Sequence, residues 1–325
     1  MTRTRPPHRL ANALWTLAAP LALTGAAAAL LLSWRDRLPD PVAVHWGPDG
    51  VDRLGTLTEL WVLPVAVFVP AFALGMWALG HFVGQSALTR RLAAAVAVWC
   101  GVYMPAVALA TAAVQLDLDD ASRAGDIGGL VALALVPATA LAVVAGWLTP
   151  GDAPQPASAP VPAGAARVPL GAHERASWVR STSQAGTWAL AAVTFASVAV
   201  LGWATRSWLP TLAFTALLGL VVLVFTQWLV TVDHRGLTVT GRLGWPRQHV
   251  PLEEVEAATV RDVNPMREFG GWGLRTRVQD GATGVVLRRG SGIEVQRTGG
   301  RRFVVTVDDA ETGAALLNTL ASRSR

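Results

Sequence analysis

The chain has 325 residues, of which 52% are hydrophobic and 15% charged, and its formal net charge is +5. The charged share is well below the roughly 25% of soluble domains, so composition favours a membrane protein. All 27 basic residues are arginine, which is typical of a GC-rich coding bias. No basic cluster interleaves with aromatic residues, which argues against a nucleic-acid partner. The single cysteine, Cys100, excludes an internal disulfide, a cysteine-based zinc motif and a redox pair.

Six uncharged apolar runs follow one another along the chain. They span residues 10–34, 60–89, 92–116, 127–151, 181–205 and 207–232. Each run is long enough to cross a hydrocarbon core of about 30 Å as one helix. The first run is longer than the apolar core of a secretory signal, about 7–15 residues, so it is interpreted as a retained helix. The sequence therefore predicts a multi-pass α-helical protein of the cell membrane with six transmembrane helices and the lipid bilayer as its first partner.

The placement of arginine predicts the orientation of these helices. If six spans alternate, one side of the membrane holds Arg3, Arg5, Arg9, Arg90, Arg91, Arg167, Arg175, Arg180, Arg235, Arg242 and Arg247. The other side holds only Arg35, Arg37, Arg53, Arg123 and Arg206. Positively charged connections stay in the cytoplasm, so both termini are predicted to be cytoplasmic and the loop at 35–59 to lie outside.

The outer loop has the local signals of a small fixed structure. Residues 42–46 read as an extended segment, and Pro48-Asp49-Gly50 reads as a turn. The following Thr56-Leu57-Thr58-Glu59 matches a helix capping box, with Thr56 as the N-cap of the second span. The loop is therefore predicted to form a reversal of the chain that leads directly into a helix.

The residues Pro39, Pro41, His45, Gly50 and Asp52 of this loop carry a family resemblance. Their spacing resembles the signature of the domain of unknown function that heads SdpI-type bacterial membrane proteins, over roughly the first third of the chain. That family comprises immunity and signalling proteins that respond to a secreted toxin. The resemblance implies a protein or peptide partner at the outer loop, with these five residues as candidates for binding it.

A metal site in the same loop is the alternative interpretation. His45, Asp49 and Asp52 offer an imidazole and two carboxylates, a set that zinc or manganese accepts. The turn already explains Asp49, and no second histidine lies near. The sequence therefore predicts neither a metal site nor a cofactor.

Composition changes after the fourth run and indicates the domain organisation. Residues 149–167 are rich in proline and alanine, which is typical of an extended linker. The predicted domains are a four-span membrane module at 1–150, a cytoplasmic linker at 151–180, a two-span hairpin at 181–232 and a cytoplasmic domain at 233–325.

The last of these domains is predicted to be β-rich. Apolar and polar residues alternate around Leu237 and Val239, around Ile293 and Val295, and from Phe303 to Val307, as in half-buried strands. A final helix follows Asp308 or Asp309, and its apolar positions are Ala314, Leu316, Leu317 and Leu320. Several strands followed by one helix suit a small barrel or sandwich.

Three segments of this region resemble bacterial pleckstrin-homology-like domains. They are residues 250–255, residues 265–275 with their Phe-Gly-Gly-Trp-Gly-Leu-Arg run, and residues 300–305 before the helix. The resemblance implies an inner-face binding site, for which Gly270, Gly271, Trp272 and Arg275 are candidates. Arg267, Arg275 and Arg277 are expected to face anionic lipid headgroups. The favoured alternative is structural, with the glycines allowing tight turns and Trp272 filling the mouth of a barrel.

The spans indicate function by the residues that they lack. Proton relays and ion-coupled transporters place charged side chains within the bilayer, and these runs contain none. Neither a nucleophile with its base nor a metal motif is visible, so an enzyme is not predicted. The expected function is non-catalytic: envelope sensing, signalling or immunity through the outer loop and an inner-face domain. The alternative is a transporter or an accessory subunit of a transport complex.

Overall fold

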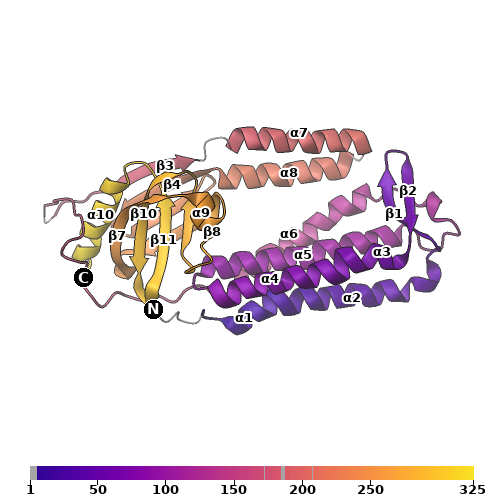
Figure 1. The fold of residues 1–325 in the computed structure, drawn as a ribbon, viewed down its shortest axis with the longest axis horizontal. Coiled ribbons are helices and arrows are strands. Elements are labelled where there is room, and N and C mark those ends of the chain that lie inside the picture. Colours follow the sequence, from indigo (N-terminus) through magenta and orange to yellow (C-terminus); the bar gives the residue numbers. More distant parts are fainter. Residues whose placement is uncertain (1–5, 172, 184–186, 207) are drawn as a thin grey trace. The chain divides into compact units, whose positions relative to one another are not determined.

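The structure, a computed structural model, describes residues 6–171, 173–183, 187–206 and 208–325. The described chain forms two compact units (Figure 1). Among the described residues, a helical unit comprises 6–151 and 193–217, and a β-rich unit comprises 152–192 and 218–325. Each unit has its own packed interior, so the two are described separately below.

Four helices of the helical unit are long and apolar enough to cross a membrane, as expected for the first four runs. They cover Arg9–Ser33, Leu57–Val83, Ala87–Ala113 and Gly128–Leu148. Their labelled parts are α1 (Arg9–Ala13), η1 (Leu14–Ala18), α2 (Ala19–Ser33), α3 (Leu57–Trp61), η3 (Val62–Val67), α4 (Phe68–Val83), α5 (Ala87–Ala113) and α6 (Gly128–Leu148). Short 3₁₀ turns lie in the connections at η2 (Arg35–Arg37) and η4 (Ala121–Arg123).

Prolines account for the wide turns within the first two long helices. Both η1 and η3 are π-helical, and Pro20 follows η1 while Pro64 lies within η3. Proline has no N–H to donate to the preceding turn, so the backbone adopts a wider turn there. The long helices therefore continue through these positions without ending.

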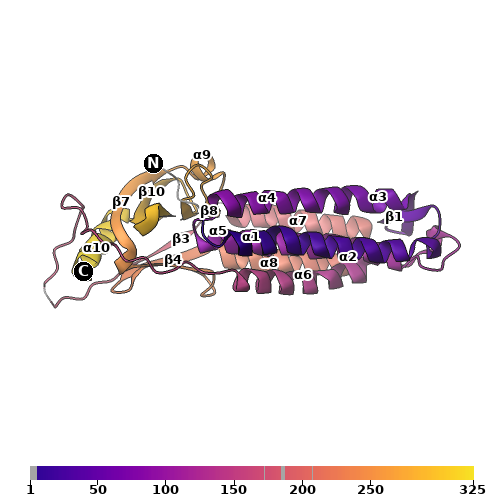
Figure 2. The same cartoon turned by 90° about the horizontal axis from the view of Figure 1, so that it is seen from below.

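Helix α5 packs against α2, α4 and α6. Figure 2 shows α2 in front, with α4 and α6 on either side of it. A Cβ on Gly101 of α5 would lie 2.7 Å from Pro20, so only glycine permits this approach to α2. At one end of α5, Arg90 is fully buried and donates to the carbonyl oxygens of Gly84 at 2.9 Å and Pro150 at 3.0 Å. A cation at these positions satisfies carbonyl groups left free where α4 and α6 end.

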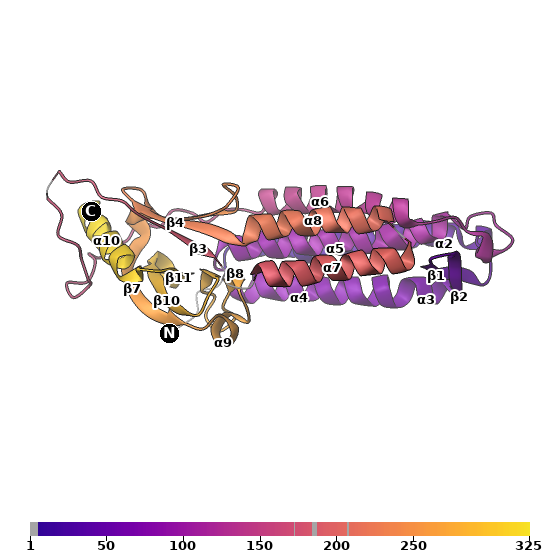
Figure 3. The same ribbon diagram turned by 90° about the horizontal axis from the view of Figure 1, so that it is seen from above.

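Two further apolar helices, α7 (Thr187–Thr205) and α8 (Trp208–Phe225), run side by side (Figure 3). They pack closely at Gly202, where a Cβ would clash with the side chain of Thr211. The prediction that the last apolar run continues to Val232 is wrong, because the helix ends at Phe225 and Gln227–Asp233 forms strand β4. The alternation of buried Trp228, Val230 and Val232 with exposed Leu229 explains why this segment is a strand.

The β-rich unit contains two sheets. The first is an antiparallel meander of β3 (Trp178–Ser183), β4 (Gln227–Asp233), β5 (Gly236–Gly241) and β6 (Arg247–Pro251). The second has the order β7 (Val255–Val263), β10 (Gly290–Arg297), β11 (Arg301–Thr306), β9 (Thr283–Val286) and β8 (Gly273–Thr276). Only β9 and β11 pair in parallel among these described strands. Helices α9 (Pro265–Phe269) and α10 (Ala310–Arg323) and turns η5 (Leu252–Glu254) and η6 (Thr298–Gly300) complete the unit.

One hydrophobic core joins both sheets to α10. Its fully buried members include Trp228, Leu237, Ile293, Phe303 and Leu317. The predicted apolar positions of the last helix, from Ala314 to Leu320, are all buried in this core. The unit also includes β3, which precedes α7 and α8 in the sequence and pairs with β4 from Trp178↔Val232 to Ser183↔Gln227. The strands therefore begin well before residue 233, where the predicted β domain begins.

Residues 152–171, here called the strap, lie within the region predicted as a linker and pack on the β-rich unit. The backbone N–H of Ala157 donates to the carbonyl oxygen of Glu253 at 2.7 Å, and Val161 is buried in the core. The N–H of Val168 donates to the Thr319 hydroxyl of α10 at 2.9 Å. An extended proline-rich segment has unpaired backbone groups along its length, and here the β-rich unit supplies partners for several of them.

Candidate functional site

The loop singled out in the sequence is a β-hairpin at one end of the helical unit. Its strands are β1 (Val42–Gly47) and β2 (Gly50–Gly55), which pair from Val42↔Gly55 to Gly47↔Gly50. Gly50 has φ of 115°, a conformation that other residues rarely adopt, so the turn requires glycine there. The predicted extended segment and turn are confirmed.

A buried glutamine fastens this hairpin to the end of α5. The side chain of Gln115 accepts from the N–H of Ala43 at 2.6 Å and donates to the carbonyl oxygen of Ala43 at 2.9 Å. It also donates to the carbonyl oxygen of Thr111 at 2.7 Å, and it is fully buried. One amide thus satisfies a backbone donor and two carbonyl groups in a water-poor position.

His45 and Trp46 hold the middle of the hairpin. His45 Nδ1 lies 2.6 Å from Asp52 Oδ1 across the two strands, and both side chains are about half exposed. The indole N–H of Trp46 donates to the carbonyl oxygen of Gly125 at 3.0 Å, in the connection before α6. The hairpin is thereby tied to two separate helices, through Gln115 to α5 and through Trp46 to the start of α6.

Charged side chains surround the base of the hairpin. Thr56 accepts from the N–H of Glu59 at 3.1 Å as predicted, but the Glu59 carboxylate pairs with Arg53 at 2.5 Å, so only half of the capping box forms. Arg37 makes two hydrogen bonds to Asp117, at 2.9 and 2.5 Å. The Arg37 guanidinium lowers the pKa of Asp117, chiefly through these hydrogen bonds, and Asp117 raises the pKa of Arg37 in the same way.

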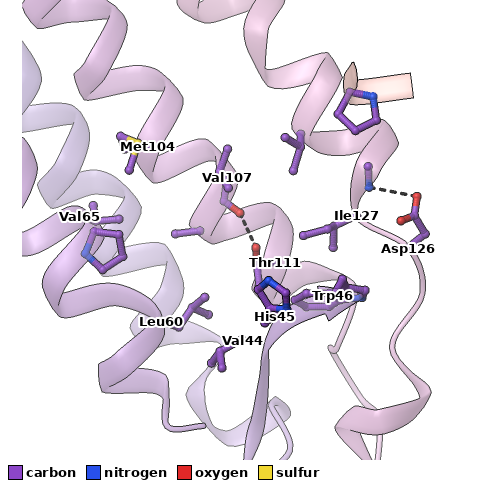
Figure 4. Close-up of a pocket in the computed structure, with 15 residues that line it drawn as sticks. Val44, His45, Trp46, Leu60, Val65, Met104, Val107, Thr111, Asp126 and Ile127 are labelled. Atoms are coloured by element: carbon purple, nitrogen blue, oxygen red, sulfur yellow. Dashed lines mark hydrogen bonds between the residues drawn. The ribbon is translucent and has the colours of Figure 1, made fainter. Parts of the chain in front are cut away.

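A pocket of about 330 Å³ lies directly beneath the hairpin (Figure 4). Its wall is mostly apolar and comes from α3, η3, α5, α6 and the start of α8. The lining comprises Val44, His45, Trp46, Leu60, Pro64, Val65, Met104, Val107, Ala108, Thr111, Asp126, Ile127, Gly128, Val131 and Pro210. The Thr111 hydroxyl donates to the carbonyl oxygen of Val107 at 2.8 Å, and the Asp126 carboxylate accepts from the N–H of Gly128 at 3.0 Å. His45 and Asp126 therefore supply the polar character of a largely apolar site.

The five predicted loop residues separate into two groups. His45 lines the pocket, and Asp52 binds the His45 imidazole. Pro39 and Pro41 precede strand β1, Gly50 lies at the turn of the hairpin, and none of these three residues lines the pocket. The sequence interpretation missed Gln115 and Asp126, which come from other parts of the chain. Gln115 is the last polar residue of the run at 92–116, and Asp126 directly precedes the run at 127–151. Their positions at the ends of predicted spans are the signals that the sequence offers.

The inner-face candidates lie between α9 and β8. Gly270 and Gly271 have φ of 68° and 147°, which supports the predicted tight turns. Trp272 is 42% exposed, and the guanidinium of Arg275 donates to its carbonyl oxygen at 2.8 Å. The expectation that Arg277 faces lipid is not met, because its side chain is only 11% exposed and pairs with Asp280 at 2.7 Å and Glu268 at 3.3 Å.

The metal alternative finds no geometric support in the hairpin. Asp52 pairs with His45, while Asp49 pairs with Arg206 at 3.2 Å. Across the part of the chain that the structure describes, no three His, Cys, Asp or Glu side chains group as metal ligands. The chemistry available beneath the hairpin is the burial of apolar groups next to an imidazole and a carboxylate.

The fold and the pocket define a class: a chain with four helices fit to cross a membrane, a hairpin-covered pocket at one end of them, and a separate β-rich unit. Comparison with family models, curated proteins and solved structures gave no match.

Proposed function

We propose that this chain is an integral membrane protein with six spans, in which α7 and α8 are the fifth and sixth. Both helices are apolar, with uncharged stretches at 191–204 and 208–224. With six spans, the arginine asymmetry puts the hairpin outside the cell and the β-rich unit in the cytoplasm. Arg206, between α7 and α8, then lies on the same side as the hairpin, which agrees with its ion pair to Asp49.

The proposed role is non-catalytic sensing at the cell envelope, and the pocket beneath the hairpin is the observation that carries it. A volume of about 330 Å³ falls within the range of small-ligand sites, about 300–1,000 Å³. The hairpin is held by buried hydrogen bonds, so the pocket is formed before any ligand arrives. A preformed site binds without the entropy cost of ordering a loop.

The proposed ligand is an amphipathic peptide with cationic groups. Its apolar side chains would enter between α5 and α6, and its positive charge would meet Asp126 at the pocket wall. Asp36, Asp40 and Asp52 are exposed on the same predicted outer side. The resemblance of the hairpin to SdpI-type proteins, which respond to a secreted toxin, supports a peptide as partner.

The β-rich unit is proposed to be pleckstrin-homology-like and to bind partners at the inner face. Support comes from a four-stranded antiparallel meander, a second sheet and a C-terminal helix packed on the common core. The fifth strand of the second sheet and the parallel pairing of β9 with β11 are additions to that simple plan. Sensing would then connect a ligand outside to a domain inside through the helices.

A photoreactive methionine at Met104 tests the proposed function, because Met104 lines the pocket. In the double variant Met76→Leu, Met266→Leu, Met104 is the one methionine after the initiator Met1, so metabolically incorporated photo-methionine enters the pocket only at position 104. The matched control carries Met104→Leu and Met266→Leu, which leaves Met76 on α4. After irradiation of native cells, mass spectrometry should find a peptide adduct at Met104 and not at Met76. Lipid adducts alone, or equal adducts at both sites, would contradict a peptide-sensing pocket.

A further inference from the structure

The β5–β6 turn exposes large apolar side chains between two arginines. It reads Arg-Leu-Gly-Trp-Pro-Arg over residues 242–247. Leu243 is 55% exposed and Trp245 is 65% exposed. Arg242 and Arg247 are also exposed, and neither pairs with a carboxylate within the described ranges of the chain. Apolar side chains at the tip of a turn, flanked by arginines, are typical of a segment that meets a lipid surface.

The position of this turn is fixed next to the end of α8, within the β-rich unit. Gly241, which precedes the turn, pairs with Trp228 at the start of β4. A Cβ on Gly241 would lie 3.0 Å from the carbonyl oxygen of Val224, in the last turn of α8. The turn therefore begins in contact with the residues where the apolar helix gives way to the sheet.

The opposite end of the same sheet provides an internal comparison. There, His234 and Arg235 form the β4–β5 turn, and the carboxylate of Asp233, the last residue of β4, accepts from the backbone N–H of Arg235 at 2.8 Å. This hydrogen bond and the neighbouring Arg235 lower the pKa of Asp233, against the effect of burial. One turn of the sheet is thus polar and internally paired, while the turn beside α8 has apolar side chains and unpaired cations.

We propose that the 242–247 turn inserts Leu243 and Trp245 into the interface of the inner leaflet, with Arg242 and Arg247 on anionic headgroups. The proposal rests on α8 being a membrane span, as in the proposed function. Tryptophan is favoured at this depth because its ring is apolar and its N–H can be hydrated. Each arginine near an anionic surface should favour insertion about fivefold. The turn would hold the first sheet at the membrane, next to the helix that leads into it.

Depth-dependent quenching of a single label tests this proposal in the full chain. In a Cys100→Ala background, Leu243→Cys carries an environment-sensitive fluorophore, and the protein is placed in nanodiscs that contain anionic lipid and doxyl-labelled lipid. His234→Cys, in the polar turn, is the matched control, and Leu220→Cys on the exposed surface of α8 is the reference for a membrane span. The label at 243 should be quenched several-fold more than the label at 234, and its emission should shift to the blue.

The reference separates failure of this proposal from failure of the six-span architecture. A label at 220 in hydrocarbon with a label at 243 in water would overturn the interfacial turn alone. A label at 220 in water would overturn both α8 as a span and the turn that depends on it. Trp245→Ser should reduce quenching at 243, because the anchoring ring is lost.

The charge requirement is tested with the same label. Arg242→Gln, Arg247→Gln or replacement of anionic lipid by phosphatidylcholine should each lower the ratio of inserted to free turn, by about fivefold for one arginine. High salt should act in the same direction, since the Debye length shrinks from about 10 Å at 0.1 M to about 3 Å at 1 M. Quenching that is unchanged in all of these conditions would overturn the assignment of anionic headgroups.

Discussion

Gln115 is the single residue on which the position of the hairpin most depends. Its side chain is buried and makes three hydrogen bonds, two of them to Ala43. Gln115→Leu keeps the approximate volume but leaves a backbone N–H and carbonyl groups without partners. Such groups cost about 1–3 kcal/mol when buried, so local opening should be easier by that amount. Hydrogen exchange at the Ala43 amide should therefore be faster by about 5- to 150-fold.

The control for Gln115 is the ion pair between Arg37 and Asp117, since Asp117 lies two residues after Gln115 on the same connection. Arg37→Gln removes the hydrogen bonds to Asp117, but both of those side chains are more than half exposed. Exposed ion pairs contribute little to stability, so exchange at Ala43 should remain close to that of the parent. If Arg37→Gln opened the hairpin as much as Gln115→Leu does, the buried amide would not be the fastening.

His45 is the residue whose replacement should separate binding from folding. The hairpin keeps its ties through Gln115 and Trp46, so His45→Ala should leave the abundance of the protein near normal. It should nevertheless reduce the peptide adduct at Met104, and His45→Gln should do nearly the same, since an amide does not reproduce the aromatic ring that lines the pocket. Arg53→Gln, opposite His45 in the hairpin and outside the pocket lining, is the matched control. Full adduct yield with His45→Gln would make the histidine a structural clasp.

Local rules predicted the hairpin but only part of the pocket. The segment from Val42, the turn at Gly50 and the cap at Thr56 depend on neighbours in sequence, so they were visible. Gln115 contacts Ala43 across 72 residues, and Asp126 reaches the pocket through the start of α6. Propensities and turn signals act between neighbours in sequence, so they do not specify which distant residues will lie under a turn.

At the scale of elements, the strap is held by a buried cluster of charges. The carboxylate of Glu254 is only 6% exposed, lies 2.5 Å from Arg297 and 3.0 Å from Arg301, and accepts from the N–H of Gln155 in the strap at 3.2 Å. Burial lowers the pKa of Arg301, and Arg297 adds to this, while Glu254 opposes it. The strap also accepts a hydrogen bond from Thr298 at the Gln155 carbonyl oxygen.

Glu254→Gln should loosen the strap strongly. It leaves two largely buried guanidinium groups without their shared carboxylate, and breaking a buried pair in this way costs about 3–5 kcal/mol. Hydrogen exchange at Gln155 and Ala157 should become at least about tenfold faster. Glu253→Gln is the control, because the Glu253 side chain is exposed and its hydrogen bond to the strap comes from the backbone carbonyl oxygen. Equal exchange in the two variants would show that the charge cluster does not hold the strap.

Element boundaries were less predictable than the elements, for a physical reason. The second and third runs were divided at Arg90 and Arg91, yet α4 ends at Val83 and α5 begins at Ala87. Ser86 caps α5 by accepting from the N–H of Leu88 at 3.2 Å, so the arginines lie in the first turns of the helix. Strand β4 was read as part of a span because its residues are uncharged, and its pairing with β3 was not visible in the sequence.

At the scale of the whole molecule, the proposed protein joins an outer binding pocket to an inner β-rich unit. The connection is direct in sequence, because β3 leads to α7 and α8 leads to β4. The two strands are neighbours in register, so a shift of either helix would act on adjacent strands of one sheet. Packed elements that are joined in this way can carry coupling between the site that binds and the domain that responds.

Thiol labelling of intact cells tests this arrangement most directly. In a Cys100→Ala background, single cysteines replace Ser122 in the connection before α6, Arg206 between α7 and α8, and Ser324 near the C-terminus, all three of which are exposed. A membrane-impermeant maleimide should label positions 122 and 206 on intact cells and position 324 only after permeabilisation. Labelling of 324 from outside, or protection of 206 in intact cells, would contradict a six-span protein with its pocket outside and its β-rich unit within.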